Sequence, residues 1–209
     1  MSTPKQLIEG FRRFRELHFA EDPELFQDLT QFGQTPKALV VACCDSRVDP
    51  ALVLDCAPGD LFVIRNVANL VPPAENQGHY HGTSAALEFG VRNLAVPHII
   101  VLGHAQCGGI HALLAGGVPK EDSFIAEWMG LAEDARKRIE QEFADATDKM
   151  RHRACEQQAI LISLSNLMTF SWIRERVEQG KITLHGWYFD IEGGELLGYN
   201  TAACQFEAL

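Results

Sequence analysis

The sequence predicts an α/β protein built on a mostly parallel central sheet with flanking helices. Short apolar runs without a polar break recur along the chain and alternate with stretches whose apolar residues return at helical spacing. A parallel strand buried on both faces produces such a run, and alternating strands and helices are typical of βαβ units. No internal repeat, low-complexity tract or linker interrupts the pattern, so we expect one domain over residues 1–209.

A helical arm, residues 1–33, is expected before the first strand. Thr3 and Pro4 form a helix start, and apolar residues at helical spacing follow as far as Leu17. A second short helix is predicted after Pro23. The arm carries five phenylalanines, more than two short helices can bury by themselves. It must therefore pack on its own domain or, as we expect, on a partner subunit.

The remaining elements follow from the positions of the apolar runs and of Gly and Pro. Strands are predicted at residues 38–42, 61–64, 98–103 and 182–189, with a short fifth strand at the sheet edge, residues 195–199. Helices are predicted at residues 51–56, 83–94, 107–116 and 122–176, the last with a break near residue 146. Residues 67–82 read as a long loop, and a loop of this length is typical of a functional segment or a subunit contact.

Composition excludes several classes of partner. The formal net charge is -10 and lysines and arginines do not cluster, which argues against nucleic acid and anionic membranes. No apolar run approaches the roughly 18 residues that span a bilayer. The first residues lack the apolar core of a signal peptide, so the six cysteines read as reduced thiols. We therefore expect a cytoplasmic location.

The first predicted strand ends abruptly in residues that carry chemistry. Two thiols, a carboxylate, a hydroxyl and a guanidinium follow Ala42, at the carboxyl end where open α/β sheets place active sites. If the backbone stays extended, Cys43, Asp45 and Arg47 point to the same side. An ordinary strand-to-turn exit with a surface Asp–Arg pair explains this stretch equally well when it is taken alone.

A second group of this kind ends the third predicted strand. His104 and Cys107 are three residues apart at a strand-to-helix corner, so both can face one point. With Cys43 they form the donor set of a tetrahedral zinc site that keeps one open position. The three meet only if the first and third strands are neighbours, as in the sheet order 2-1-3-4. A lone His-x-x-Cys pair is weak evidence, and the pairing of two strand ends carries the prediction.

The two groups together resemble the β-class carbonic anhydrases. Cys43-x-Asp45-x-Arg47 followed by His104-x-x-Cys107 is similar to the zinc signature of that family, and the likeness extends over roughly residues 34–200. The resemblance implies one Zn²⁺ per subunit and the reversible hydration of carbon dioxide to bicarbonate and a proton by zinc-bound hydroxide. It also implies that Asp45 accepts a hydrogen bond from zinc-bound water, or binds the metal itself, and that Arg47 holds Asp45.

The substrate pocket implied by the resemblance is that of the plant-type subclass. Gln34 would orient the substrate, and Phe62, Val67 and Phe89 would line an apolar pocket shared across a dimer, with Gly108 as a further contact. For each of the three apolar residues taken singly, core packing is nearly as good an explanation. The implied partners are carbon dioxide or bicarbonate and further copies of the chain in a homodimer or larger even oligomer.

Another subclass of the family has an inhibitory site for bicarbonate. That site uses a tryptophan three residues before the first ligand and a tyrosine in the fourth strand. Val40 and Phe189 stand at these places here, and only Arg65 of the site remains. We therefore expect no bicarbonate-gated inhibition.

Three alternatives stay open at this point. Cys44 stands where the family usually has serine and is a second candidate for the zinc thiolate, although the spacing to Asp45 and Arg47 favours Cys43. The same scaffold can act on carbon disulfide or carbonyl sulfide. A closed zinc site in a protein that is not an enzyme, with Asp45 as the fourth ligand, is the third alternative.

Overall fold

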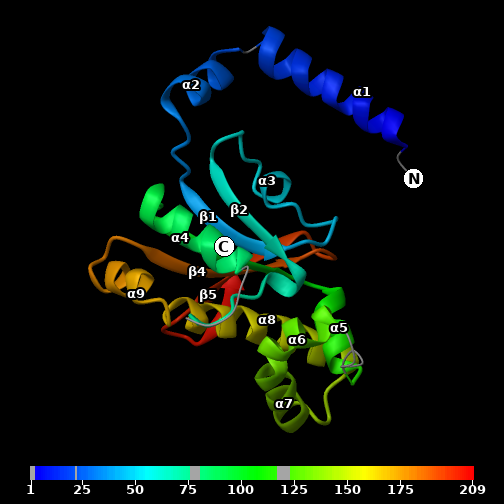
Figure 1. Cartoon of the computed structure of the whole chain (residues 1–209). Helices are drawn as coiled ribbons and strands as arrows, with labels where there is room; N and C mark the ends of the chain where they lie inside the picture. Colours follow the sequence, from blue (N-terminus) through cyan, green and yellow to red (C-terminus); the bar gives the residue numbers. More distant parts are fainter. Residues whose placement is uncertain (1–2, 22, 76–80, 117–122) are drawn as a thin grey trace. The chain divides into compact units, whose positions relative to one another are not determined.

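The computed structural model of the chain describes residues 3–21, 23–75, 81–116 and 123–209. The chain divides into two compact units, Met1–Thr35 and Pro36–Leu209. Both units are drawn in Figure 1. Within the loop predicted at residues 67–82, residues 76–80 lie outside the described ranges.

The first unit consists of helices that bury little of their apolar surface. Helix α1 (Pro4–Arg15) begins after Thr3, whose backbone N–H donates to Gln6 Oε1 at 2.6 Å. A π-helical segment, η1 (Glu16–Glu21), and helix α2 (Glu24–Phe32) follow. No residue of these three elements is buried, and the Phe11 side chain is 61% exposed. The predicted amphipathic helices are therefore present.

The second unit contains a six-stranded sheet of order β2-β1-β3-β4-β5-β6. Strands β2, β1, β3 and β4 are parallel, whereas β5 and β6 are antiparallel to their neighbours. Their bounds are β1 Ala38–Cys43, β2 Leu61–Asn66, β3 His98–His104, β4 Thr183–Asp190, β5 Glu195–Asn200 and β6 Gln205–Ala208. The predicted order 2-1-3-4 is confirmed.

The position of the fifth strand needs one correction. Strand β5 is present, but β6 pairs with it and takes the edge of the sheet. The sequence of β6 contains one large apolar residue, Phe206, which is too little to show an alternating pattern. Its pairing is stabilised by packing instead, since the Phe206 and Tyr199 rings lie 5.2 Å apart between centroids.

The helices agree with the prediction except in the carboxyl half. Their bounds are α3 Pro50–Val53, α4 Gly82–Glu88, α5 Gly108–Leu114, α6 Phe124–Met129, α7 Glu133–Glu142, α8 Asp148–Leu167 and α9 Ser171–Glu178, with short η2 Val67–Asn69, η3 Phe89–Asn93 and η4 Gly130–Ala132. The predicted break near residue 146 is present, and Thr147 caps α8 by accepting from Met150 N. A second break precedes α9, where Phe170 turns into the core and is 5% exposed.

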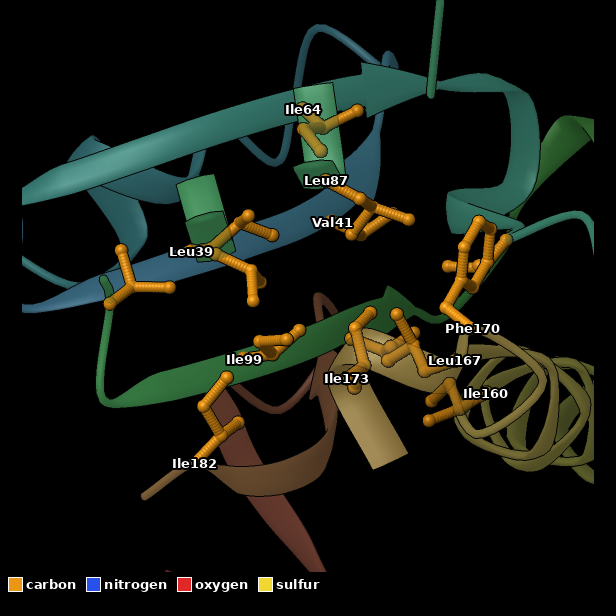
Figure 2. Packing of buried hydrophobic residues seen from close by; sticks show 14 of the residues in the cluster. Leu39, Val41, Ile64, Leu87, Ile99, Ile160, Leu167, Phe170, Ile173 and Ile182 are labelled. Carbon is orange, nitrogen blue, oxygen red and sulfur yellow. The ribbon is translucent and has the colours of Figure 1, made fainter. Parts of the chain in front are cut away.

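One face of the sheet is covered by helices and forms the main core. Helix α8 packs against β3 and β4, and α4 packs against β2. Figure 2 shows side chains from these elements pointing toward one another: Leu39 and Val41 of β1, Ile64 of β2, Ile99 of β3, Leu87 of α4, Ile160 and Leu167 of α8, and Phe170 and Ile173 around α9. This packing holds β1 beside β3, so their carboxyl ends lie together.

The close approach of α4 and η3 to the sheet depends on a glycine. A Cβ atom on Gly90 would lie 2.4 Å from Leu39 Cδ1 and 3.3 Å from Phe62 Cδ1. Only a residue without a side chain therefore allows η3 to pack against β1 at this distance.

Candidate metal centre

The carboxyl ends of β1 and β3 bring three metal-binding side chains together. Cys43 ends β1, His104 ends β3, and Cys107 precedes the first turn of α5. Their ligand atoms lie within 4.8 Å of one another, and all three residues are buried. Within the described part of the chain this is the only group of three or more His, Cys, Asp or Glu residues that meets this criterion. The geometry follows from the pairing of Ala42 with Leu102 in neighbouring strands.

The His104 ring is oriented as a metal ligand would be. Its Nδ1 lies 2.8 Å from the carbonyl oxygen of Ala105, so a neutral ring donates there and leaves a lone pair on Nε2. That Nε2 is buried and has no hydrogen-bond partner among the described residues. Buried polar atoms are rarely left without a partner, and a metal ion would supply one.

The two thiols also fit a divalent cation. The hydrogen bond with the Cys107 thiol lowers the pKa of Cys43, while the same contact, together with burial, raises the pKa of Cys107. One sulfur therefore ionises at the expense of the other, because two buried thiolates repel each other. A zinc ion would neutralise both charges and complete a Cys₂His donor set.

Asp45 and Arg47 form a bidentate ion pair beside the three ligand residues. Arg47 Nε donates to Asp45 Oδ1 at 3.0 Å, and Arg47 Nη2 donates to Asp45 Oδ2 at 2.7 Å. These hydrogen bonds, opposed in part by burial, hold the pKa of Asp45 well below its usual range. Asp45 is thus an ionised carboxylate whose two oxygens are both held by Arg47, and it lies outside the three-residue group.

The backbone that carries Asp45 and Arg47 forms a turn and is not extended. Strand β1 ends at Cys43, and the chain then turns, with Arg47 N donating to Asp45 Oδ1 at 2.9 Å. The pair therefore forms across a tight turn, and the period-two alternation of an extended strand does not apply. A small acidic residue that accepts from the backbone two residues later is the local cause.

Gln106 extends the pair toward the β4–β5 connection. Arg47 Nη2 donates to the Gln106 carbonyl oxygen at 3.0 Å, and Gln106 Nε2 donates to Glu192 Oε1 at 2.5 Å. The backbone of Gln106 has φ +58°, a left-handed conformation between the two ligands of the second motif. The sequence prediction missed this residue because a glutamine between motif positions carries no recognisable signal.

Arg65 braces the corner after β1 from the neighbouring strand β2. Its Nε donates to the Cys43 carbonyl at 3.0 Å, its Nη2 to the Asp45 carbonyl at 2.7 Å and its Nη1 to Asp49 Oδ2 at 2.8 Å. Two of the three nitrogens therefore hold the backbone of Cys43 and Asp45, and the third binds the Asp49 side chain.

A buried carboxylate lies beneath the ligand group. Glu156 of α8 is 4% exposed; its Oε1 accepts from Cys107 N at 3.0 Å and its Oε2 from Tyr188 Oη at 2.8 Å. Burial raises the pKa of Glu156, while the Tyr188 hydrogen bond opposes the rise. The prediction did not include Glu156, although a signal exists: it shares a helical stripe with buried Ala159, Ile160, Ser163 and Leu167.

The predicted pocket residues are only partly brought to the site. Val67 packs in the same cluster as Cys43 and Cys107. Phe62 and Phe89 stack on each other, with ring centroids 5.9 Å apart, and Phe62 packs against the main core on the helix-covered face. Gly108 is the exposed first residue of α5. Gln34 belongs to the other unit.

A cavity of about 900 Å³ borders the site. Its wall includes Cys44, which is exposed and lies outside the three-residue group, whereas Cys43 is buried within that group. The cavity is further lined by Arg65, Asn66, Val67, Pro72, Glu75, His81, Gly82, Thr83, Ser84, Phe124, Ile125, Glu127, Trp128 and Leu131. Trp128 Nε1 donates to the Val67 carbonyl at 2.8 Å and so fixes the position of α6 against this wall.

Fold and site together define an α/β protein with a Cys₂His group at the carboxyl ends of two neighbouring parallel strands. A protein-family model described as "Carbonic anhydrase" matches residues 38–196, which is more than half of the chain. The chain belongs to the β-class carbonic anhydrases, and as a member of that family it is a carbonate dehydratase, a lyase that hydrates carbon dioxide.

Individual relatives agree with this assignment. "Beta carbonic anhydrase 3" of Arabidopsis thaliana is 36% identical over 197 residues, which cover 93% of this chain and 76% of the relative. The solved structure of the β-carbonic anhydrase CcaA has a TM-score of 0.91 at 35% identity and covers 98% of this chain and 91% of its own. A tetrameric β-carbonic anhydrase from Sordaria macrospora has a TM-score of 0.82 at 28% identity. The match covers 92% of this chain and 94% of the Sordaria chain.

Proposed function

We propose that one zinc ion, held by Cys43, His104 and Cys107, carries the hydration of carbon dioxide in this chain. The observation that supports the proposal most directly is the buried Nε2 of His104, which has no hydrogen-bond partner among the described residues, in a group whose ligand atoms lie within 4.8 Å of one another. When bound, zinc supplies a hydroxide nucleophile at neutral pH by lowering the pKa of a coordinated water.

Asp45 and Arg47 have separate roles in this proposal. An ionised carboxylate only accepts hydrogen bonds, so Asp45 would accept a hydrogen bond from the attacking hydroxide and thereby orient its oxygen lone pair toward carbon dioxide. Arg47 holds both oxygens of Asp45 and thereby keeps this carboxylate from binding the metal itself. The closed site with Asp45 as permanent fourth ligand is disfavoured for the same reason.

The substrate pocket is proposed to form only in an oligomer. Val67 lies at the ligand cluster, and we assign Gln34, Phe62 and Phe89 to the pocket of a second subunit, with Gly108 contributing from the first turn of α5. Phe89 is 46% exposed, and the helical arm exposes Phe11 in the same way, as expected of surfaces that pack on another copy. We propose a dimer or larger even assembly in which residues 1–33 pack on the partner; an active species sedimenting near 23 kDa would contradict this.

Two further parts of the proposal concern substrate range and location. Stopped-flow assays with carbon dioxide, carbon disulfide and carbonyl sulfide distinguish hydration from the alternative hydrolase activities, and we expect turnover of carbon dioxide alone. None of the helices in the described ranges is long and apolar enough to cross a membrane. We propose a cytoplasmic location on composition, which fractionation of cells checks.

The decisive test of the ligand assignment compares the two adjacent cysteines. Cys43→Ser is expected to abolish zinc binding and turnover, because its sulfur belongs to the buried ligand group. Cys44→Ser is the matched control and should retain stoichiometric zinc and most of the activity, since Cys44 lies in the cavity wall. Metal analysis and a carbon dioxide hydration assay on both variants give the answer, and the reverse pattern would refute the assignment.

A further inference from the structure

Two histidines face each other on the sheet, far from the ligand group. His98 begins β3 and His185 lies in β4; His98 Nδ1 is 3.3 Å from His185 Nε2. His185 pairs with Ile100, two residues beyond His98, so both histidines lie on one face of the sheet. Strand β3 runs from His98 to His104, and six steps of about 3.3 Å place the pair roughly 20 Å from the ligand group.

The geometry of the pair matches that of two ligands on one metal ion. Two Zn–N bonds of about 2.0–2.1 Å at a tetrahedral angle separate the nitrogens by about 3.3–3.4 Å and the ring centroids by about 5.2 Å. The observed separations are 3.3 Å for the nitrogens and 5.3 Å for the centroids, with the rings tilted by 59°.

A second histidine pair in the chain shows the contrasting arrangement. His111 and His152 stack with centroids 4.6 Å apart and an angle of 13° between the rings. Nitrogen lone pairs lie in the ring planes, so nearly parallel rings cannot direct them at one point. In addition, His152 Nδ1 lies 2.7 Å from the Asp148 carbonyl oxygen and is thus engaged. This pair is a natural control for the first.

We propose that His98 and His185 form a second metal site, for a borderline divalent transition metal such as Zn²⁺ or Ni²⁺, with water as the remaining ligands. Imidazole nitrogens suit these ions. His98 is exposed at the start of β3, so water can reach the pair, and His185 borders a cavity of about 280 Å³ that also contacts Trp187 and Glu207. Burial, followed by the charge on His98, lowers the pKa of His185, so its neutral, metal-binding form is favoured.

A metal bound here would join β3 to β4 at their amino-terminal ends. The binding free energy adds to the stability of the folded chain by mass action, because the unfolded chain does not preserve the pair. The site is independent of the catalytic proposal, so it is tested by binding rather than by turnover.

The test is a titration of the zinc-loaded protein with Ni²⁺, which thiols do not reduce. Calorimetry should show one Ni²⁺ bound per chain with the original zinc retained. Tryptophan emission should fall, because the Trp187 and His185 ring centroids are 6.0 Å apart. His98→Gln and His185→Gln should each weaken binding at least ten-fold, about 1.4 kcal/mol, whereas His111→Gln should bind Ni²⁺ as the wild type does.

Two results would overturn the proposal. The first is a wild-type protein that takes up no Ni²⁺ beyond its zinc. The second is Ni²⁺ binding that persists unchanged in both His98→Gln and His185→Gln, as it would if the exposed thiols of Cys44 and Cys204 captured the ion. His98 is exposed, so His98→Gln is expected to fold, and circular dichroism with retained carbon dioxide hydration confirms that for both variants.

Discussion

Tyr188→Phe removes one buried hydroxyl beneath the ligand group and leaves the aromatic ring in place. Tyr188 is 1% exposed and donates to Glu156 Oε2 at 2.8 Å, while Glu156 Oε1 holds the backbone N–H of Cys107. In the variant, Glu156 Oε2 remains buried but no longer accepts a hydrogen bond from the Tyr188 hydroxyl. A buried polar atom left unsatisfied costs about 1–3 kcal/mol, and we expect the free energy of unfolding to fall by this amount.

The loss should also depend on pH, with a sign that follows from Glu156. Burial raises the pKa of Glu156, and removing the Tyr188 hydrogen bond raises it further. A carboxyl group whose pKa is higher in the folded state than in the unfolded state contributes most to the free energy of unfolding at pH values below its unfolded-state pKa. That contribution is lost as the pH rises through the folded pKa. The deficit of Tyr188→Phe relative to wild type is therefore smallest at acidic pH and grows toward alkaline pH.

Urea unfolding of the zinc-loaded proteins at about pH 5.5 and about pH 8 measures both effects. Tyr199→Phe, on the neighbouring strand β5, is the matched control because Tyr199 is only half-buried. It should change stability by less than about 0.5 kcal/mol. A second readout is the rate at which a chelator removes zinc, which should rise in Tyr188→Phe as the Cys107 turn loosens. Unchanged stability, or a deficit that grows toward acidic pH, would refute the reasoning.

Other changes have equally definite expected outcomes. Arg47→Ala should keep stoichiometric zinc and lose nearly all turnover, because Asp45 is released from its two hydrogen bonds with Arg47. Arg47→Lys should restore turnover only in part, since a lysine cannot reproduce the planar fork of the guanidinium. Near-normal turnover of Arg47→Ala would contradict the proposal that Arg47 restrains Asp45. Gly90→Ala should cost about 1–3 kcal/mol in urea unfolding, since its Cβ would meet Leu39 at 2.4 Å, whereas Gly130→Ala, with nothing within 4 Å, should not. The carbon dioxide hydration activity should show no steep, bicarbonate-enhanced loss as the pH falls. A cooperative loss would show that the bicarbonate-gated inhibitory site is present.

The expectation that this gated inhibition is absent has a structural rationale. Val40 is fully buried on the sheet face opposite the main core, with Phe189 packed against the same cluster. All three Arg65 nitrogens donate to the corner after β1. The one basic residue that the chain shares with the gated subclass is therefore already committed to holding the Cys43 backbone.

The sequence predicts best those parts of the fold whose residues form a clear pattern along a whole element. Strands β1 and β3 are uninterrupted apolar runs, and each ends in residues that suit a metal site. A single geometric requirement, that Cys43 and His104 meet, then orders the strands as 2-1-3-4. The structure confirms this order because burial on both faces leaves little choice of position for such strands.

Features that depend on tertiary contacts were not predictable in this way. Strand β6 exists through pairing with β5 and has almost no apolar pattern of its own. Glu156 lies in a buried helical stripe, but nothing in the sequence identifies Cys107 N–H as its partner. The sequence places Asp45 and Arg47 on one side if the backbone stays extended, whereas in the structure a turn after Cys43 brings the two side chains together.

The substrate pocket is the least predictable part for a different reason. Phe62 and Phe89 stack on each other, and we propose that a second chain completes the pocket. A local sequence pattern cannot distinguish a side chain that packs in its own core from one that completes a neighbour's site.

Zinc K-edge X-ray absorption of the purified wild-type protein, combined with metal analysis, tests whether Cys43, His104 and Cys107 hold a catalytic zinc. We expect one zinc per chain at the catalytic centre, bound by two sulfur atoms and two lighter nitrogen or oxygen atoms, in a protein that hydrates carbon dioxide. A third sulfur ligand would place Cys44 at the metal, and an active protein without zinc would remove the proposed chemistry altogether. Either result would contradict the assignment of Cys43, His104 and Cys107 as the ligands of a catalytic zinc.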